Sequence, residues 1–157
     1  MNKLKHIGIA ANTAEGAALC YKTIVVEAGK VLGKSIHPEI SLHSYSLNIY
    51  DQKEDIKDWD GLAVIVNSSI EKLALTGADF IIMPSNHPHY AIKQIQSLSS
   101  LPVLSIVAIT VAECQEKGYK TVGILGIANT MSGGLYETPL KEAGLTPVVP
   151  TKKEQRS

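Results

Sequence analysis

A short polar segment, Ser85-Asn86-His87-Pro88-His89, carries the side chains of this chain that are best suited to chemistry, and it directly follows the apolar run 79–84. That run is typical of a buried strand, so the polar groups stand where the strand would end. In an open α/β sheet, this edge is where ligands bind. Asn86 offers both donors and an acceptor to a carboxylate or an ammonium group. The segment is therefore the first candidate for a binding or catalytic site.

Each of these side chains also has a purely structural interpretation. Ser85 could act in catalysis only beside a group that takes its proton, which His87 or His89 could supply. Otherwise Ser85 is a turn residue or a hydrogen-bond donor to a ligand. Asn86 could bond local backbone and hold the loop, and His89 could order the loop as readily as take part in chemistry. His87 is by default exposed, and the sequence leaves these alternatives open.

Two further loops also place polar side chains after a predicted strand. Ala11-Asn12-Thr13-Ala14 lies between a predicted strand and a helix N-terminus, where free backbone N–H groups and the helix dipole attract a carboxylate. This loop does not follow Gly-x-Gly-x-x-Gly, so a dinucleotide site is not indicated. The later loop 127–131 also lies between a predicted strand and a helix N-terminus. There Thr130 is a helix N-cap, a ligand for a carboxylate, or both.

The elements that must position these loops alternate along the chain. Short β-branched runs alternate with longer amphipathic ones, which indicates βαβ units on a parallel sheet with helices on both faces. We predict strands at 6–11, 40–45, 80–83, 103–106, 121–125 and 146–149, and helices at 15–32, 60–75 and 90–98. Another helix ends at Lys117, and Gly133 or Gly134 interrupts or delays the helix that follows the fifth strand. The predicted fold class is α/β, with a doubly wound, Rossmann-like parallel sheet.

Composition excludes several classes of function. The 157 residues carry fifteen basic and fifteen acidic side chains, interspersed and with a net charge of +0, so there is no basic stripe for nucleic acid or for a membrane surface. No apolar stretch approaches the roughly 20 residues that span a bilayer, and the start lacks a signal-peptide core. We expect a cytoplasmic protein with a small neutral or zwitterionic ligand. Cys20 and Cys114 lie far apart, which predicts neither a disulfide nor a metal site.

The segment from Ser85 to His89 resembles the Cys-Asn-Thr-x-His signature of the aspartate/glutamate racemase family. Asn86 and His89 are in register, whereas His87 stands where threonine is usual. Ser85 stands in place of the first catalytic cysteine, as in a subset of the family whose first turn is similar to the segment 12–21. The resemblance covers essentially the whole chain. Its other matches, in order, are Ile7-Gly8-Ile9, Asp58-Trp59-Asp60, the segments 77–80 and 122–126, and Thr130-Met131 followed by Tyr136.

The resemblance implies a cofactor-independent amino-acid racemase, an isomerase that takes a proton from Cα on one face and returns one on the other. It places Ser85 at the first catalytic position, where a hydroxyl is a far weaker acid than a thiol. The substrate-binding residues that we predict are Asn12, Asn86, His89, Thr130 and Met131. The implied partners are a small amino-acid substrate and a second copy of the chain in a homodimer. An acidic substrate side chain has no evident partner, because the only arginine is Arg156.

Racemases of the family that this chain resembles have two similar α/β lobes, and their active site lies between the lobes. The resemblance implies a first lobe at 1–100, with the Ser85-Asn86 loop, and an incomplete second lobe at 101–157. We therefore expect a C-terminally truncated chain without the segment that carries the second catalytic cysteine. The alternative to an active racemase is an inactive remnant that at most binds a small carboxylate or amino acid.

Overall fold

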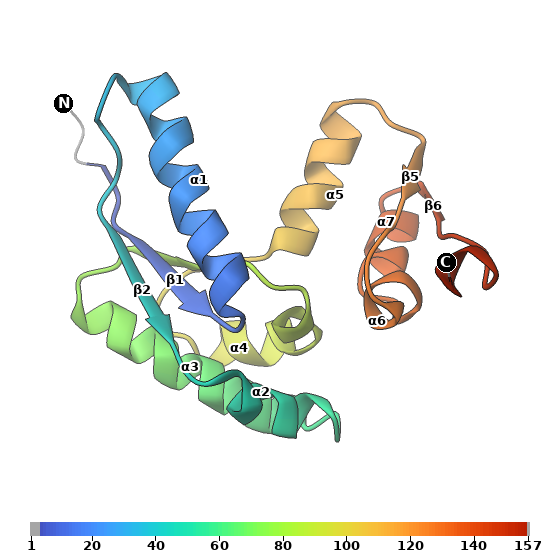
Figure 1. Cartoon of the computed structure of the whole chain (residues 1–157), viewed down its shortest axis with the longest axis horizontal. Helices are drawn as coiled ribbons and strands as arrows, with labels where there is room; N and C mark the ends of the chain where they lie inside the picture. The colour runs from blue at the N-terminus through green and yellow to red at the C-terminus, as the bar shows by residue number, and fades with distance from the viewer. Residues whose placement is uncertain (1–3, 157) are drawn as a thin grey trace. The chain divides into compact units, whose positions relative to one another are not determined.

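Two compact units make up the chain, with the division after Ser105. The computed structural model describes residues 4–156. The first unit holds a four-stranded parallel sheet in the order β2-β1-β3-β4, and the second holds the parallel pair β5-β6. Helices flank the first sheet (Figure 1), which confirms the predicted α/β class.

The elements of both units follow the alternation seen in the sequence. The first unit contains β1 (Ile7–Ala11), α1 (Ala14–Leu32), β2 (Ile40–Ser44), α2 (Leu47–Glu54), α3 (Trp59–Leu75), β3 (Phe80–Ile82), the 3-10 helix η1 (His87–Ala91), α4 (Ile92–Leu98) and β4 (Val103–Leu104). The second contains α5 (Ile106–Glu116), β5 (Thr121–Gly123), α6 (Ala128–Ser132), α7 (Glu137–Glu142), β6 (Thr146–Val148) and the 3-10 helix η2 (Glu154–Arg156). The sequence pattern does not predict α2, and it starts the helix after the fifth strand later than α6 begins. It also extends the fourth strand to Ile106, where the structure begins α5.

The two faces of the first sheet are covered by different helices. Side chains alternate along β1, so that Ile9 packs with Ala17 of α1 on one face. Ala10 points to the other face, where it joins Ile81 of β3 and Ile70 of α3 in the main core. Figure 1 shows α1 on one side of this sheet and α2, α3 and α4 on the other. Both faces of the central strands are therefore buried, as the apolar runs in the sequence require.

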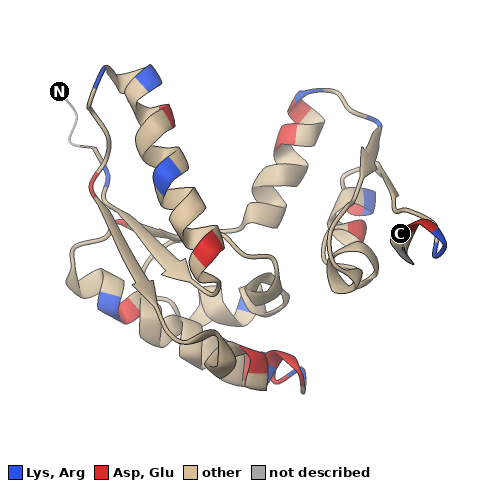
Figure 2. Cartoon of the chain, in the orientation of Figure 1, with Lys and Arg blue, Asp and Glu red and all other residues tan. Residues whose placement is uncertain are grey.

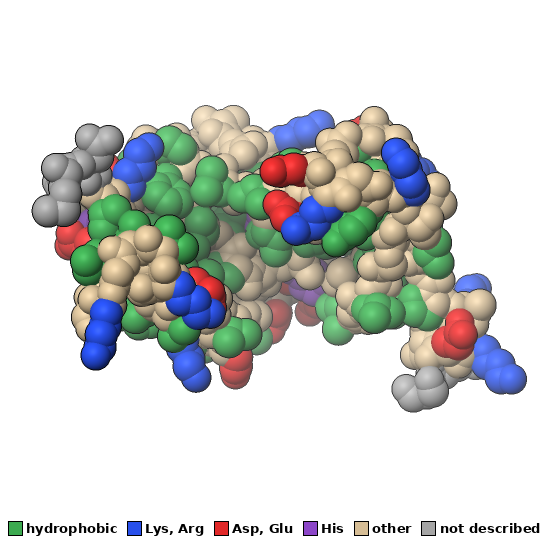
Figure 3. Space-filling model, turned by 90° about the horizontal axis from the view of Figure 1, so that it is seen from above, with side chains coloured by type: hydrophobic (Ala, Val, Ile, Leu, Met, Phe, Trp, Pro, Cys, Tyr) green, Lys and Arg blue, Asp and Glu red, His purple; other side chains and the backbone are tan. Residues whose placement is uncertain are grey.

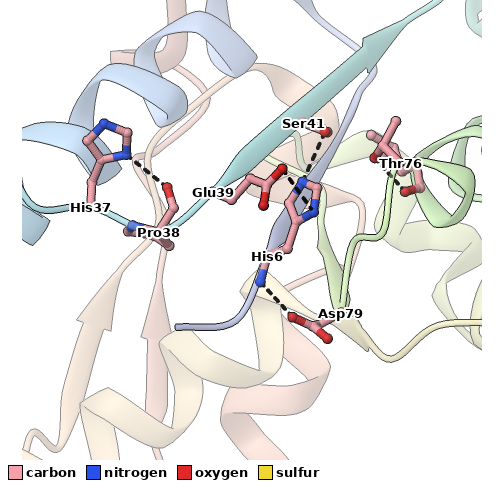
Figure 4. A network of polar contacts seen from close by, with 8 residues as sticks. His6, His37, Pro38, Glu39, Ser41, Thr76 and Asp79 are labelled. Carbon is pink, nitrogen blue, oxygen red and sulfur yellow. Dashed lines mark hydrogen bonds and ion pairs between the residues drawn. The ribbon is translucent and has the colours of Figure 1, made fainter. Parts of the chain in front are cut away.

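The amino ends of three strands are tied together by His6, which precedes β1. Its backbone N–H donates to Asp79 Oδ2 at 2.6 Å, and its ring Nε2 lies 3.0 Å from Ser41 Oγ (Figure 4). Asp79 precedes β3 and Ser41 lies in β2, so the buried His6 joins the central strand to both of its neighbours. These contacts help to fix the register of the sheet at the edge opposite the predicted site.

The second unit has a small core of its own, in which α5 and α7 pack with β5 and β6. Its buried members are Val111, Cys114, Ile124, Leu140 and Leu145. No helix within residues 4–156 is long and apolar enough to cross a membrane.

Charged side chains are interspersed over the described residues, as Figure 2 shows. Acidic groups are most concentrated from the end of α2 to the start of α3, where Glu54, Asp55, Asp58 and Asp60 follow one another closely. Hydrophobic side chains also reach the surface (Figure 3). On α1 they include Leu19, which is 65% exposed, and Val26, which is 50% exposed.

Gly16 marks a close approach between α1 and the segment that follows β3. A Cβ atom at this position would stand 2.9 Å from the carbonyl oxygen of Pro84 and 2.8 Å from Thr13 Oγ1. We expect Gly16→Ala to lower the free energy of unfolding by about 1–3 kcal/mol, because backbone atoms cannot give way as a flexible side chain can. Urea denaturation of the purified chain measures this loss.

Gly29→Ala is the matched control, because Gly29 lies in the same helix and nothing lies within 4 Å of the added Cβ. Alanine favours a helix more than glycine does, so this variant should be unchanged or more stable by up to about 1 kcal/mol. Equal losses of stability in the two variants would contradict the packing argument.

Candidate functional site

The carboxyl edge of the first sheet brings Asn12 and Ser85 together. Asn12 follows β1 and Ser85 follows β3, and these two strands are neighbours. The switch point of the sheet lies between them, because the chain leaves β1 toward β2 on one side and returns to β3 on the other. Ser85 Oγ donates a hydrogen bond to Asn12 Oδ1 at 3.2 Å, and Asn12 is buried.

The hydroxyl of Ser85 has no base beside it in the described structure. His89 Nδ1 lies 2.8 Å from the carbonyl oxygen of Ser85, so this ring contacts the backbone and not the hydroxyl. His87 Nδ1 lies 2.7 Å from Glu54 Oε2. The partner of the hydroxyl is the Asn12 amide oxygen, which accepts a hydrogen bond but is not a proton acceptor at neutral pH. As placed here, Ser85 is a hydrogen-bond donor to Asn12.

His89 holds the loop that follows β3. It is 2% exposed, and its backbone N–H donates to the carbonyl oxygen of Asn86 at 3.0 Å. Burial lowers the pKa of the His89 ring, and the bond to the Ser85 carbonyl opposes that shift only in part. The neutral ring must carry its proton on Nδ1 to donate to that carbonyl. This geometry fits the loop-ordering interpretation of His89.

The other predicted binding residues are divided between the two units. Asn86 is half-buried at the N-cap of η1, where its side chain makes no capping bond. Thr130 and Met131 lie in α6 of the second unit, and both are buried. The N-cap of α6 is Ile127, so the prediction that Thr130 caps this helix is wrong. The helix begins earlier than the sequence pattern suggests, which places Thr130 inside it.

Two residues that sequence reasoning missed complete the first unit's site, and both lie on α2. The hydroxyl of the buried Tyr50 donates to the carbonyl oxygen of Ala11 at 3.1 Å. Glu54 Oε1 accepts from Asn12 Nδ2 at 3.3 Å. Tyr50 is the one buried residue of α2, so this helix has almost no apolar periodicity to detect. Ser46, a favourable residue at its N-cap position, is the only local signal.

The Glu54 carboxylate is the main charged group of this site. Its side chain is 10% exposed, and burial raises its pKa. The charge and the hydrogen bond of His87 lower that pKa, and the charge of Asp51 adds to the upward shift. The default expectation that His87 is exposed is wrong, because its side chain is only 29% exposed and is paired with Glu54.

Metal-ligating side chains do not gather anywhere in residues 4–156: no three His, Cys, Asp or Glu residues are placed to hold an ion. The ring of His43 contacts a hydroxyl group, with Nδ1 2.8 Å from Ser69 Oγ. Both cysteines are free thiols, with Cys114 buried and Cys20 half-buried. Burial raises the pKa of the Cys20 thiol, which makes the thiolate less accessible.

Comparison with known proteins decides the family. A family model described as Asp/Glu/Hydantoin racemase matches residues 8–157. The chain belongs to this racemase family. It is 31% identical over 108 residues to the broad specificity amino-acid racemase RacX of Bacillus subtilis (strain 168). That match covers 69% of this chain and 46% of RacX, so the chain spans about half the length of this relative.

Solved structures of racemase-family proteins have the same fold. An aspartate racemase homologue from Pyrococcus horikoshii OT3 is 28% identical with a TM-score of 0.86, and a Yersinia pestis protein classed as an Asp/Glu racemase is 24% identical with a TM-score of 0.88. Each match covers 98% of this chain and 67% of the solved chain. The racemase-type α/β fold predicted from the sequence is thereby confirmed.

The burial of His89 makes stability depend on pH. An unfolded histidine titrates near 6.5, and the folded His89 has a lower pKa. Between these values the unfolded state binds more protons, so stability falls as the pH drops below about 6.5, by at most about 1.4 kcal/mol per pH unit for one group. His89→Gln keeps a donor for the Ser85 carbonyl and loses the titration. We expect a smaller loss of stability in this variant between about pH 7 and pH 5, measured by urea denaturation.

His43→Gln is the control for this comparison, because burial and the charge of Lys72 also lower the pKa of His43. The two variants should each remove part of the pH dependence, and His89 is the more deeply buried of the two rings. An unchanged slope in His89→Gln would show that its ring does not stay neutral in the folded chain.

Proposed function

We propose that this chain acts as an amino-acid racemase by proton transfer at Cα without a cofactor, with Ser85 at the first catalytic position. Family membership and the relation to RacX support an amino-acid substrate. The observation that carries the proposal is the hydrogen-bonded pair of Asn12 and Ser85 at the switch point of the first sheet. This is where an open α/β sheet binds its ligand, and Ser85 stands at the position of the family's first catalytic cysteine.

In this proposal the substrate's backbone groups are bound by amide and hydroxyl groups. Asn12 and Asn86 supply donors and acceptors for the ammonium and carboxylate groups, while His89 holds the loop that carries Asn86. Thr130 and Met131, which lie in α6, stay predicted binding residues. The free N–H groups at the start of α1 attract the carboxylate from the side of Asn12.

The substrate in this proposal has a side chain without a negative charge. Lys53 Nζ lies 2.7 Å from Asp58 Oδ2, and His87 is paired with Glu54. Lys53 and His87, the basic side chains that contact carboxylates at the carboxyl end of α2, are therefore already engaged. The side chain of aspartate or glutamate would need a cation of its own, so we expect uncharged amino acids to be preferred.

One observation favours a second candidate function, which is binding of an amino acid without turnover. The Ser85 hydroxyl donates to an amide oxygen, and neither His87 nor His89 contacts it. A hydroxyl without an adjacent base is a poor group for removing a weakly acidic Cα proton. The same residues would still hold the ligand by hydrogen bonds.

Incorporation of solvent deuterium at Cα, followed by proton NMR, separates the two functions. The panel contains L- and D-amino acids with uncharged side chains together with aspartate and glutamate, and the proteins are this chain, Ser85→Ala and Ser85→Cys. We expect exchange above the protein-free control that Ser85→Ala reduces to background. Ser85→Cys should raise exchange on the order of tenfold or more, because a thiol forms its anion far more readily than a hydroxyl.

The outcomes assign the function. Background exchange from all three proteins would contradict turnover and leave binding as the better proposal, to be followed by amide chemical-shift changes on addition of the same amino acids. Exchange that survives in Ser85→Ala would remove Ser85 from the catalytic position. A preference for aspartate or glutamate would overturn the proposed substrate class.

A further inference from the structure

Four side chains from three segments form a continuous chain of polar contacts beside the proposed ligand site. Ser85 Oγ donates to Asn12 Oδ1 at 3.2 Å, and Asn12 Nδ2 donates to Glu54 Oε1 at 3.3 Å. The second oxygen of Glu54, Oε2, lies 2.7 Å from His87 Nδ1. Each carboxylate oxygen of Glu54 thus has one partner, from a different segment of the chain.

Because the Glu54 carboxylate is buried, its charge depends on its contacts with Asn12 and His87. The Glu54 side chain is 10% exposed, and the group that offsets its charge is His87. In the described structure His87 Nε2 is buried without a hydrogen-bond partner, so Glu54 supplies the polar contact of that ring. The other titratable group that acts on Glu54 is Asp51, which lies on α2 itself and opposes ionisation.

The chemistry of Glu54 fixes which way the Asn12 amide faces. An ionised carboxylate accepts hydrogen bonds and donates none, so Asn12 must turn its NH₂ group toward Glu54. Its carbonyl oxygen then faces Ser85 and accepts the hydroxyl proton in a hydrogen bond. With its proton committed to Asn12, Ser85 Oγ keeps its lone pairs for a donor on a ligand.

We propose that Glu54 and His87 are positioning residues that set the orientation of the Asn12 amide, and thereby make Ser85 Oγ an acceptor for the ammonium group of the bound amino acid. His87 holds Glu54 in its ionised, acceptor-only form against the effect of burial. If Glu54 gains a proton, or is replaced by an amide, Asn12 is free to turn over and Ser85 loses its fixed role. The ligand in this inference rests on the proposed function, but the orientation of Asn12 does not.

The test follows the side-chain NH₂ signals of Asn12 by ¹⁵N–¹H NMR as the pH of the full chain is lowered, with Asn12→Ala to assign them. In the unchanged chain these signals should titrate with Glu54, whose pKa is raised by burial. In His87→Gln the midpoint should move to higher pH, because the charge of His87 that favours the carboxylate is gone while a hydrogen-bond donor is kept. In Glu54→Gln this titration should disappear.

Asp51→Asn is the matched variant, for which we expect a shift of the midpoint in the opposite direction. Removing a negative charge beside Glu54 should move the midpoint to lower pH. Should Glu54→Gln fail to fold, the opposed shifts of His87→Gln and Asp51→Asn still decide the matter. Asn12 signals that keep the same midpoint in both variants would overturn the inference. A purely structural effect of the substitutions would not shift the midpoint of the Asn12 signals in opposite directions in His87→Gln and Asp51→Asn.

Binding of L-alanine at about neutral pH tests the role of Ser85 as an acceptor. Glu54→Gln should weaken binding by about three- to tenfold, the contribution of one hydrogen bond, while Asp51→Asn should leave it unchanged. Equal affinity in Glu54→Gln would overturn the acceptor role. If the Asn12 signals respond as expected but the unchanged chain binds no L-alanine, the orientation mechanism stands and the proposed ligand class fails, so the two failures are distinguishable.

Discussion

The parallel pairing of β1 with β3 is the constraint on which the first unit's site depends. The two strands pair in register from Ile7 with Phe80 to Ile9 with Ile82, and both faces of the pair are buried. Because parallel strands end at the same edge, the pairing places the residues after each strand side by side. Asn12 and Ser85 meet for this reason, although they lie far apart in the sequence.

The polar groups at this edge are tolerated in a buried setting because they satisfy one another. Burying a carboxylate or an amide is costly unless each finds a partner. Glu54, Asn12 and Ser85 form such a set, and the second oxygen of Glu54 is paired with His87 Nδ1. The same arrangement that removes the cost also fixes the direction of each hydrogen bond, which is what a binding site requires of its side chains.

The proposed match of Ser85 to the family's first catalytic cysteine bears on what this edge of the sheet can do. A thiol can be tuned to an anion at neutral pH, whereas a hydroxyl needs a neighbouring base. Both candidate histidines are engaged elsewhere, His87 by Glu54 and His89 by the Ser85 carbonyl. The residue types and the tertiary contacts therefore bear on catalysis together, and neither alone separates turnover from binding.

The sequence by itself determined the α/β alternation, most strands and helices, and the location of the Ser85 loop after a buried strand, because local periodicity records which residues are buried. It also pointed to Asn12 and Ser85 as residues at strand ends. Only the tertiary structure decided that Glu54 joins them, since α2 has one buried residue and no clear pattern. It likewise decided the roles of His87 and His89, because the partner of a polar side chain is set by segments that are distant in sequence and meet only in the folded chain.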